Sequence, residues 1–243
     1  MNVEFNSDSA LGTKEYWDQH YDVELTNFDD TGDEGCVWFG RNSENRMLKF
    51  VRENVPSDAP IVEMGLFCAD CDQLSPGSRL LSFLAILTGD QRSQGYTKLC
   101  GLDYSERAIE LCRKTSNQQL EGKEVPEINF QTADILSDLN ETQSQLCHKH
   151  DVVLDKGTWD AISLNGDRML RLAQYRSAVL SLFRESGEKR YFVIFSCNFT
   201  GDELVDLFKC EALNFFQEIP TQSQMTFGGK TGVTTTGVVF KVS

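Results

Sequence analysis

Apolar runs and amphipathic stretches alternate along most of the chain. Strands that alternate with helices form a mainly parallel sheet with helices on both faces, so the pattern predicts an α/β fold. The predicted strands are residues 61–64, 98–103, 129–132, 151–155 and 191–196, and the predicted helices are residues 80–87, 105–114 and 169–182.

Two of the predicted helices have a recognisable apolar face that we expect to pack on the sheet. Ser105 is a suitable N-cap for the helix at 105–114, because a serine side chain can accept a hydrogen bond from the first turn. The predicted buried positions are Ala108, Ile109, Leu111 and Cys112 in this helix, and Leu170, Ala173, Val179 and Leu180 in the helix at 169–182.

The pattern changes near the C-terminus, where two strand-like segments follow one another without a helix. Residues 213–219 and 234–241 are joined by the glycine-rich stretch 227–232. A parallel pairing would need a crossover connection, so we expect this pair to be antiparallel.

The composition suits one globular domain of 243 residues, with 40% hydrophobic and 25% charged side chains. There are 37 acidic and 23 basic side chains, and the net charge is −14. Such a charge repels nucleic-acid phosphates and anionic membranes and favours a cationic partner. We therefore expect a basic protein as partner, no nucleic acid and no membrane.

Much of the negative charge lies at the N-terminus. Residues 1–40 contain ten acidic side chains and one base, Lys14, and carry −9 of the net charge. This divides the chain into an acidic arm, residues 1–40, and a domain, residues 41–243. Aromatic side chains lie among the carboxylates of the arm, at Trp17, Tyr21, Trp38 and Phe39. The arm is either a solubilising segment or a docking surface for a basic protein.

Eight scattered cysteines do not form a disulfide framework. The N-terminus lacks the basic start and apolar core of a signal peptide, and the longest apolar runs are too short to cross a bilayer. We expect free thiols in a cytoplasmic protein, with the nucleus as a further location.

Chemistry-bearing residues follow each predicted strand. In an open α/β sheet, ligands bind outside the carboxyl ends of the strands. Several carboxylates at one crevice suit ribose hydroxyls, an exocyclic amine and positive charge, whereas a pyrophosphate would be repelled. The residues at the strand ends are Glu63 and Gly65, Asp103 and Tyr104, Asp134, Asp155, and Ser196 to Asn198.

Six blocks stand out, in order over almost the whole chain: Leu11-Gly-Thr-Lys-Glu-Tyr-Trp-Asp18, Trp38-Phe-Gly40, Gly101-Leu-Asp-Tyr-Ser105, Asp155-Lys-Gly-Thr-Trp-Asp-Ala-Ile162, Ser196-Cys-Asn-Phe-Thr200 and Phe227-Gly-Gly-Lys230. Together they resemble the lysine methyltransferases of eukaryotic translation elongation factor 1-alpha, in the branch called methyltransferase-like ten. The resemblance implies the Rossmann-like, seven-strand class I methyltransferase fold with an antiparallel C-terminal hairpin, S-adenosylmethionine as methyl donor and a protein lysine as acceptor. We also expect a monomer.

The resemblance also implies roles for single residues. Asp155, as the catalytic position, would lie beside the methyl donor and face the acceptor. The implied cofactor-binding residues are Glu63 and Gly65 under the methionine moiety, Asp103 at the ribose, Tyr104 at the adenine, Asp134 at the adenine amine, and Ile135 nearby. The implied substrate-binding residues are Trp38, Phe39, Asn198 and Phe227.

The chain departs from the family pattern directly after the first strand. Only Gly65 of the expected glycine turn is present, and Leu66–Pro76 stands where the first helix should begin. Gly65 and Asp103 are 38 residues apart, against about 20 in a compact unit. The stretch is an accommodated loop, a change that weakens cofactor binding, or an interruption in the gene model. A non-catalytic binding protein is therefore the alternative to an enzyme.

The sequence offers no convincing metal site. Cys68 and Cys71 form a Cys-x-x-Cys pair, but they follow the first strand, whereas Cys147, His148 and His150 precede the fourth strand at the opposite edge of the sheet. Two other enzyme classes fit the sequence less well. A nicotinamide-dependent oxidoreductase would need a fuller glycine motif after the first strand. A nucleic-acid amino-methyltransferase would carry a proline-containing motif at the position where the block starting at Asp155 stands. We expect no metal.

Overall fold

The computed structural model describes residues 9–33, 39–66, 87, 95–122, 127–137, 145–221, 225–227, 230–232 and 235–243. Seven strands form one sheet in the order β3-β2-β1-β4-β5-β9-β6. They are β1 (Ile61–Met64), β2 (Leu99–Asp103), β3 (Asn129–Thr132), β4 (Val152–Lys156), β5 (Tyr191–Ser196), β6 (Leu213–Ile219) and β9 (Thr236–Val242). The five strands predicted before residue 200 are confirmed, with shifts of one residue at some ends.

The strand order reverses next to β1. From β1 the chain adds β2 and β3 on one side, and then β4 and β5 on the other, all parallel. β9 lies between β5 and β6 and is antiparallel to both, which confirms the expected antiparallel C-terminal pair. A ligand site is expected outside the carboxyl ends of β1 and β4, where the order reverses.

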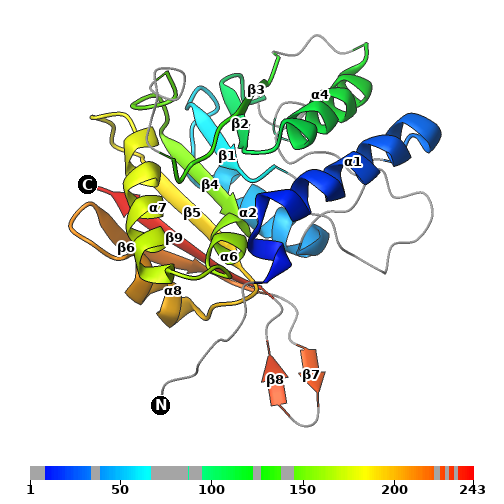
Figure 1. The fold of residues 1–243 in the computed structure, drawn as a ribbon. Coiled ribbons are helices and arrows are strands. Elements are labelled where there is room, and N and C mark those ends of the chain that lie inside the picture. The colour runs from blue at the N-terminus through cyan, green and yellow to red at the C-terminus, as the bar shows by residue number, and fades with distance from the viewer. Residues whose placement is uncertain are drawn as a thin grey trace.

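Helices cover both faces of the sheet (Figure 1). One face packs on α1 (Lys14–Thr31), α2 (Gly40–Asn54) and α4 (Glu106–Leu120), and the other on α6 (Thr158–Ile162), α7 (Arg168–Leu182) and α8 (Gly201–Phe208). Successive strand residues alternate between the two cores, with Ile61 in the first and Val62 in the second. This alternation follows from the two-residue repeat of a strand.

Helix α4 starts where it was predicted to start, but Ser105, at its N-cap, does not make the expected capping hydrogen bond. Its Oγ instead donates to Asp18 of α1 at 2.7 Å, and its backbone N donates to Asp103 at 2.9 Å. The predicted apolar face, Ala108, Ile109, Leu111 and Cys112, is confirmed as buried.

The predicted face of α7 is partly wrong. Leu170 is 54% exposed and Ala173 is also exposed, while Val179 is buried as predicted. The buried positions are Leu172, Tyr175, Ala178, Val179 and Leu182, which keep the three- and four-residue spacing of one helix face. Leu170 lies in the first turn of α7. Its backbone N donates to the side chain of Asp167, which caps the helix.

The described part of the acidic arm belongs to the packed domain. α1 contributes Trp17, Tyr21 and Leu25 to the core. Its acidic side chains pair with bases of α4: Asp22 lies 2.9 Å from Arg107, and Asp29 lies 2.8 Å from Lys114. Figure 1 shows α1 lying along α4.

The glycine-rich stretch contains a separate two-stranded hairpin of β7 (Met225–Phe227) and β8 (Lys230–Gly232), which projects from the body of the molecule (Figure 1). The predicted helix at 80–87 lies outside the described residues except for Leu87, which is helical and buried. None of the described helices combines the length and the apolarity that a membrane span requires.

Candidate cofactor site

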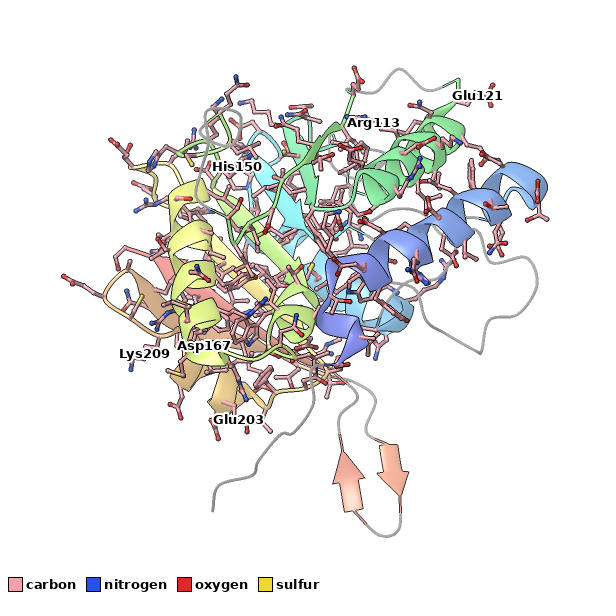
Figure 2. All side chains as sticks on the ribbon, viewed as in Figure 1. Arg113, Glu121, His150, Asp167, Glu203 and Lys209 are labelled. Atoms are coloured by element: carbon pink, nitrogen blue, oxygen red, sulfur yellow. The ribbon has the colours of Figure 1, made fainter. Side chains whose placement is uncertain are left out.

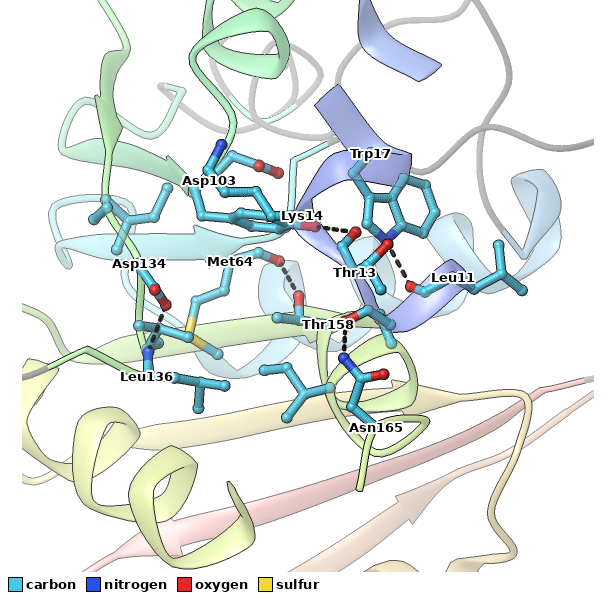
Figure 3. A pocket seen from close by; sticks show the side chains of 18 of the residues that line it. Leu11, Thr13, Lys14, Trp17, Met64, Asp103, Asp134, Leu136, Thr158 and Asn165 are labelled. Atoms are coloured by element: carbon cyan, nitrogen blue, oxygen red, sulfur yellow. Dashed lines mark hydrogen bonds between the residues drawn. The ribbon is translucent and has the colours of Figure 1, made fainter. Parts of the chain in front are cut away.

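A cavity of about 360 Å³ lies at the carboxyl ends of β1 and β2 (Figure 3). The strand ends contribute Met64, Gly65, Leu102, Asp103 and Tyr104, and residues 133–136 follow β3. The remaining walls come from residues 11–15, Trp17 and Tyr21 near the start of α1, from Thr158, Ala161 and Ile162 of α6, and from Asn165 and Arg171. The cavity therefore lies at the predicted edge of the sheet.

Gly65 forms a close contact that excludes any larger residue. Its φ is +66°, and a Cβ atom built there would overlap Oγ1 of Thr158. That hydroxyl donates to the carbonyl of Met64 at 2.9 Å. The end of β1 is thus pressed against the start of α6, which is the close backbone approach that requires glycine.

Asp103 lines the cavity as a buried carboxylate. Its Oδ1 accepts from the N of Ser105 at 2.9 Å, and its Oδ2 accepts from the N of Leu66 at 3.2 Å. Burial raises the pKa of Asp103 to about 7, against the lowering effect of these two backbone donors. A carboxylate oxygen can accept further hydrogen bonds, so Asp103 can still bind a hydroxyl in the cavity.

Tyr104, Asp134 and Ile135 also line the cavity, as predicted. The Tyr104 ring lies beneath Lys14, whose Nζ is 5.3 Å from the ring centroid. Asp134 is exposed, and its Oδ1 accepts from the N of Leu136 at 2.9 Å (Figure 3). A planar ring and an exposed carboxylate at one end of the cavity suit a purine with an exocyclic amine.

Glu63 does not line the cavity, although the sequence placed it at the cofactor. Its side chain is 2% exposed, and burial raises its pKa to about 7, with Lys156 opposing and Glu44 adding to the rise. Glu63 lies in β1 on the same sheet face as Ile61, two residues before Gly65. Glu63 is therefore not among the residues that line the cavity, and its role under the methionine moiety stays a prediction.

Asp155 is likewise not a cavity residue. Its side chain is 0% exposed, and its oxygens accept from the N of Thr158 at 2.7 Å, from the N of Trp159 at 3.1 Å and from the hydroxyl of Tyr175. Burial raises its pKa to about 7, which the Tyr175 bond opposes. The predicted catalytic carboxylate thus holds the turn between β4 and α6, and its place beside the methyl donor stays a prediction.

Two of the four predicted substrate-binding residues, Phe39 and Asn198, have side chains within the described part of the chain. Phe39 packs on the turn after β4, where a Cβ on Gly157 would lie 3.2 Å from its ring. Asn198 is exposed, and its N donates to Oγ of Ser196 at 3.0 Å. Neither is among the cavity residues. Trp38 and the side chain of Phe227 lie outside the described residues.

Asp160 organises the end of β5, a role that the sequence reasoning did not identify. Its Oδ1 accepts from the hydroxyl of Ser196, and its Oδ2 accepts from the N of Cys197 at 2.8 Å. Asp160 is 2% exposed. Because these bonds tie α6 to the turn after β5, the block containing Asp155 and the block containing Asn198 form one unit.

Residues 11–14 and Asn165 were missed as site residues, although all of them line the cavity. The available signal was the block at residues 11–18, which the resemblance singled out as a unit. The acidic composition of residues 1–40 favoured a surface role for the whole segment. Gly12 and Thr13, which line the cavity, are common turn and cap residues and do not by themselves indicate a ligand site.

The described residues contain no group of three or more metal-ligating side chains. Cys68 and Cys71 lie outside the described part of the chain. His150 lies before β4, at the edge of the molecule away from Asp167 and Glu203, which mark the starts of α7 and α8 (Figure 2).

Known proteins resemble the chain over nearly its full length, although no protein-family model matches it. EEF1A lysine methyltransferase 2 of Mus musculus is 36% identical over 234 residues, which cover 96% of this chain and 84% of that protein. The chain belongs to the EEF1A lysine methyltransferase 2 family. A more distant relative, Protein-lysine N-methyltransferase efm4 of Schizosaccharomyces pombe, is 33% identical over 241 residues, 97% of this chain and 95% of that protein.

The fold of this family member is the class I methyltransferase fold. The geranyl diphosphate C-methyltransferase of Streptomyces coelicolor A3(2), solved with S-adenosyl-L-homocysteine, superposes with a TM-score of 0.51 at 10% identity, over 96% of this chain and 87% of that chain. At such low identity the likeness concerns the fold alone. The predicted family and fold are confirmed, and the departure at Leu66–Pro76 lies, except for Leu66, outside the described residues.

Proposed function

We propose that this protein is an S-adenosylmethionine-dependent protein-lysine N-methyltransferase and that its substrate is translation elongation factor 1-alpha. Membership of the EEF1A lysine methyltransferase 2 family supports this reaction. The observation that carries the proposal is the cavity itself, which brings Gly65, Asp103, Tyr104 and Asp134 together at the reversal in strand order.

These residues fit S-adenosylmethionine. Asp103 would accept from the ribose hydroxyls, Tyr104 would contact the adenine, and Asp134 would accept from its amine. Gly65 allows the end of β1 to approach Thr158 closely, and its backbone lines the cavity where the methionine moiety would lie. When bound, the cofactor supplies a methyl group on a positively charged sulfur.

Transfer of that methyl group to an amine is an in-line displacement. The lone pair of a neutral lysine forms the new N–C bond while the S–C bond breaks, and the nitrogen then loses a proton to water. Alignment and a dry path are needed more than a nucleophilic side chain. The Asp155 and Asp160 bonds fix the turns after β4 and β5, and these turns carry Thr158 of the cavity wall and the implied substrate-binding residue Asn198.

The acidic charge supports a basic protein as partner. Although Asp22 and Asp29 of α1 pair with bases of α4, both pairs are exposed, and the whole chain keeps a net charge of −14. Complementary charge mainly raises association rates and is screened over about 8 Å at physiological salt.

The five described cysteines are free thiols, which supports a reducing, cytoplasmic location.

The decisive experiment is a methylation assay with the folded elongation factor, labelled S-adenosylmethionine and mass spectrometry of the product. We expect labelled lysine with the wild type and strongly reduced labelling with Asp103→Ala. Calorimetry with S-adenosylmethionine distinguishes the alternative. Cofactor binding without turnover would indicate a non-catalytic binding protein, and no binding would contradict the proposed cofactor site.

The role of the acidic arm needs a charge-matched control. One variant neutralises Asp29, Asp30, Asp33 and Glu34, and the control neutralises Glu127, Glu185, Glu188 and Glu211. We expect the arm variant alone to raise the apparent KM for the folded factor and to reduce its dependence on salt. Equal KM values and salt dependence in both variants would contradict a docking role for the arm.

A further inference from the structure

A short segment, residues 10–13, passes along the cavity and is here called the strap. It comprises the turn of 3-10 helix at Ala10–Gly12 and Thr13, the N-cap of α1. The carbonyl of every strap residue accepts a side-chain hydrogen bond. Trp17 Nε1 donates to Leu11 at 2.7 Å, and the side chain of Thr13 donates to Ala10 at 2.7 Å. These two bonds are internal to the N-terminal segment and make the strap a stiff unit.

The other two bonds connect the strap to the domain on different sides of the cavity. Tyr104, at the end of β2, donates its hydroxyl to the carbonyl of Thr13 at 3.5 Å. Asn165, after α6, donates its Nδ2 to the carbonyl of Gly12. Figure 3 shows the strap between Trp17 and Asn165. Tyr104 and Asn165 both line the cavity, so the strap spans it between two of its walls.

Gly12 and Asn165 are also matched in shape. A Cβ atom on Gly12 would lie 2.6 Å from Oδ1 of Asn165, so the contact leaves no room for a larger residue. That Oδ1 is buried and has no hydrogen-bond partner among the described residues. Asn165 therefore uses its donor side for the strap, and its position is fixed by one bond.

The helix behind the strap is held independently. Trp17 and Tyr21 belong to the core, and Asp18 accepts from Ser105 at 2.7 Å. Loss of the Asn165 bond would therefore free the strap from the wall that carries Asn165, while Tyr104 and Trp17 still hold its other side and α1 stays in place. Such a division between a fixed helix and a short segment held by single bonds is what a gate over a cavity requires.

We propose that Asn165 is a positioning residue that holds the strap over the bound S-adenosyl ligand, so that the ligand leaves only when the bond from Asn165 to Gly12 breaks. The inference rests on the proposed cofactor site. It concerns the rate of ligand exchange, which the family assignment does not specify.

The test measures dissociation of tritiated S-adenosyl-L-homocysteine after a chase with unlabelled ligand. We expect Asn165→Ala to dissociate about fivefold faster than the wild type, the factor that one neutral hydrogen bond contributes. Asn165→Asp keeps the size but places an acceptor against the Gly12 carbonyl, so it should dissociate at least as fast. Ser163→Ala is the matched control, because Ser163 lies in the same loop and donates to Asp160 instead of the strap.

A second variant keeps the proposal testable if Asn165→Ala does not fold. Gly12→Ala should also speed dissociation, because its methyl group forces the strap away from Asn165. The double variant should dissociate no faster than Asn165→Ala alone, since the truncated side chain leaves room for the methyl group. A merely structural role would instead lower the urea midpoint in each variant and leave the dissociation rate of the folded fraction unchanged.

Two results would overturn different statements. A wild type that does not bind the labelled ligand would contradict the proposed cofactor site. A wild type that binds, with unchanged dissociation rates in Asn165→Ala and in Gly12→Ala, would contradict the role of the strap and leave the cofactor site in place.

Discussion

Asp103 is the last residue of β2 and Asp155 the last but one of β4, and these two strands flank β1 on opposite sides. The two carboxylates differ in what their oxygens bind. Both are buried, and burial raises both pKa values to about 7. Asp103 accepts from two backbone N–H groups and lines the cavity, whereas Asp155 accepts from two backbone N–H groups and from Tyr175 and does not line it. A strand-end carboxylate can thus serve a ligand or a turn, and its own hydrogen bonds decide which.

The same contrast separates the two halves of the sheet edge. On the β2–β3 side, Asp103 and Asp134 remain open to the cavity. On the β4–β5 side, Asp155 and Asp160 hold the local backbone. The carboxylates on the β2–β3 side are therefore available to a ligand, whereas those on the β4–β5 side stabilise the local backbone.

Asp155→Ala tests the contrast with the largest expected effect. The change leaves the N–H groups of Thr158 and Trp159 and the hydroxyl of Tyr175 without their acceptor in a buried place. We expect the free energy of unfolding to fall by about 3–5 kcal/mol, as for the loss of one partner from a buried polar network. Urea denaturation measures it, and Tyr175→Phe, which removes one bond, should cost about 1 kcal/mol. A loss below that of Tyr175→Phe would contradict the structural role.

Asp103→Ala should have the reverse pattern. Hydrogen bonds from ribose hydroxyls to a charged acceptor are worth about 1.5–3 kcal/mol each, so cofactor affinity should fall at least about tenfold. Folding should be affected much less than by Asp155→Ala. Calorimetric titration with S-adenosyl-L-homocysteine, together with urea denaturation of both variants, measures the two effects. Unchanged affinity would remove Asp103 from the site.

The pH dependence of cofactor binding sharpens the assignment to Asp103. Below about pH 7 its carboxyl is protonated and accepts hydrogen bonds less well, so affinity should fall roughly fivefold between pH 8 and pH 6. Lys14 and Asp18 are the charges that act on it, with opposite signs. Titrations at several pH values measure the slope, and a slope that persists in Asp103→Ala would assign the dependence to another group.

The same pKa shift has the opposite sign for the stability of the free protein. The folded state binds the proton of Asp103 more tightly than the unfolded chain, whose carboxyl has a pKa near 3.8. The contribution of this group to stability is therefore present below about pH 4 and is lost as the pH rises to about 7. As the pH rises from about 4 to 8, ionisation of Asp103 should thus increase the affinity for the ligand and decrease the stability of the free protein.

Asp134→Asn should have the smallest effect of the series. Asp134 is exposed, and water can replace a weakened hydrogen bond there, so we expect cofactor affinity to fall only about threefold. Competition between adenosine and inosine analogues of the cofactor is the sensitive measurement, because the analogues differ at the exocyclic group. An equal preference in wild type and variant would contradict a contact between Asp134 and the adenine amine.

The runs of apolar residues along the sequence predicted the strands well. The apolar run at Tyr191–Ser196 has the observed bounds, and the missing crossover helix was enough to predict the antiparallel pairing of β6 and β9. The direction of a side chain within a turn was not predictable. Asp155 and Asp103 occupy equivalent places in the pattern, and only the distant Tyr175 shows that Asp155 turns inward.

The strap could not be assigned to the site for a similar reason. Gly12 and Asn165 are 153 residues apart, and the bond between them uses a backbone carbonyl, which every residue has. Charge was the dominant signal in residues 1–40 and favoured a surface role. The buried side of α1, with Trp17 and Tyr21, follows instead from spacing along a helix that the charge pattern obscured.

The position of β9 has a consequence for how the protein is made. This strand pairs with β5 on one side and β6 on the other, yet it is synthesised after both. Until residues 236–242 leave the ribosome, β5 presents an unpaired and largely apolar edge, and β6 has no partner in the sheet. Open edges of this kind pair readily with other chains. The nascent protein is therefore prone to aggregate in the interval between synthesis of β6 and synthesis of β9, and a delay in translation between these two strands would lengthen that interval.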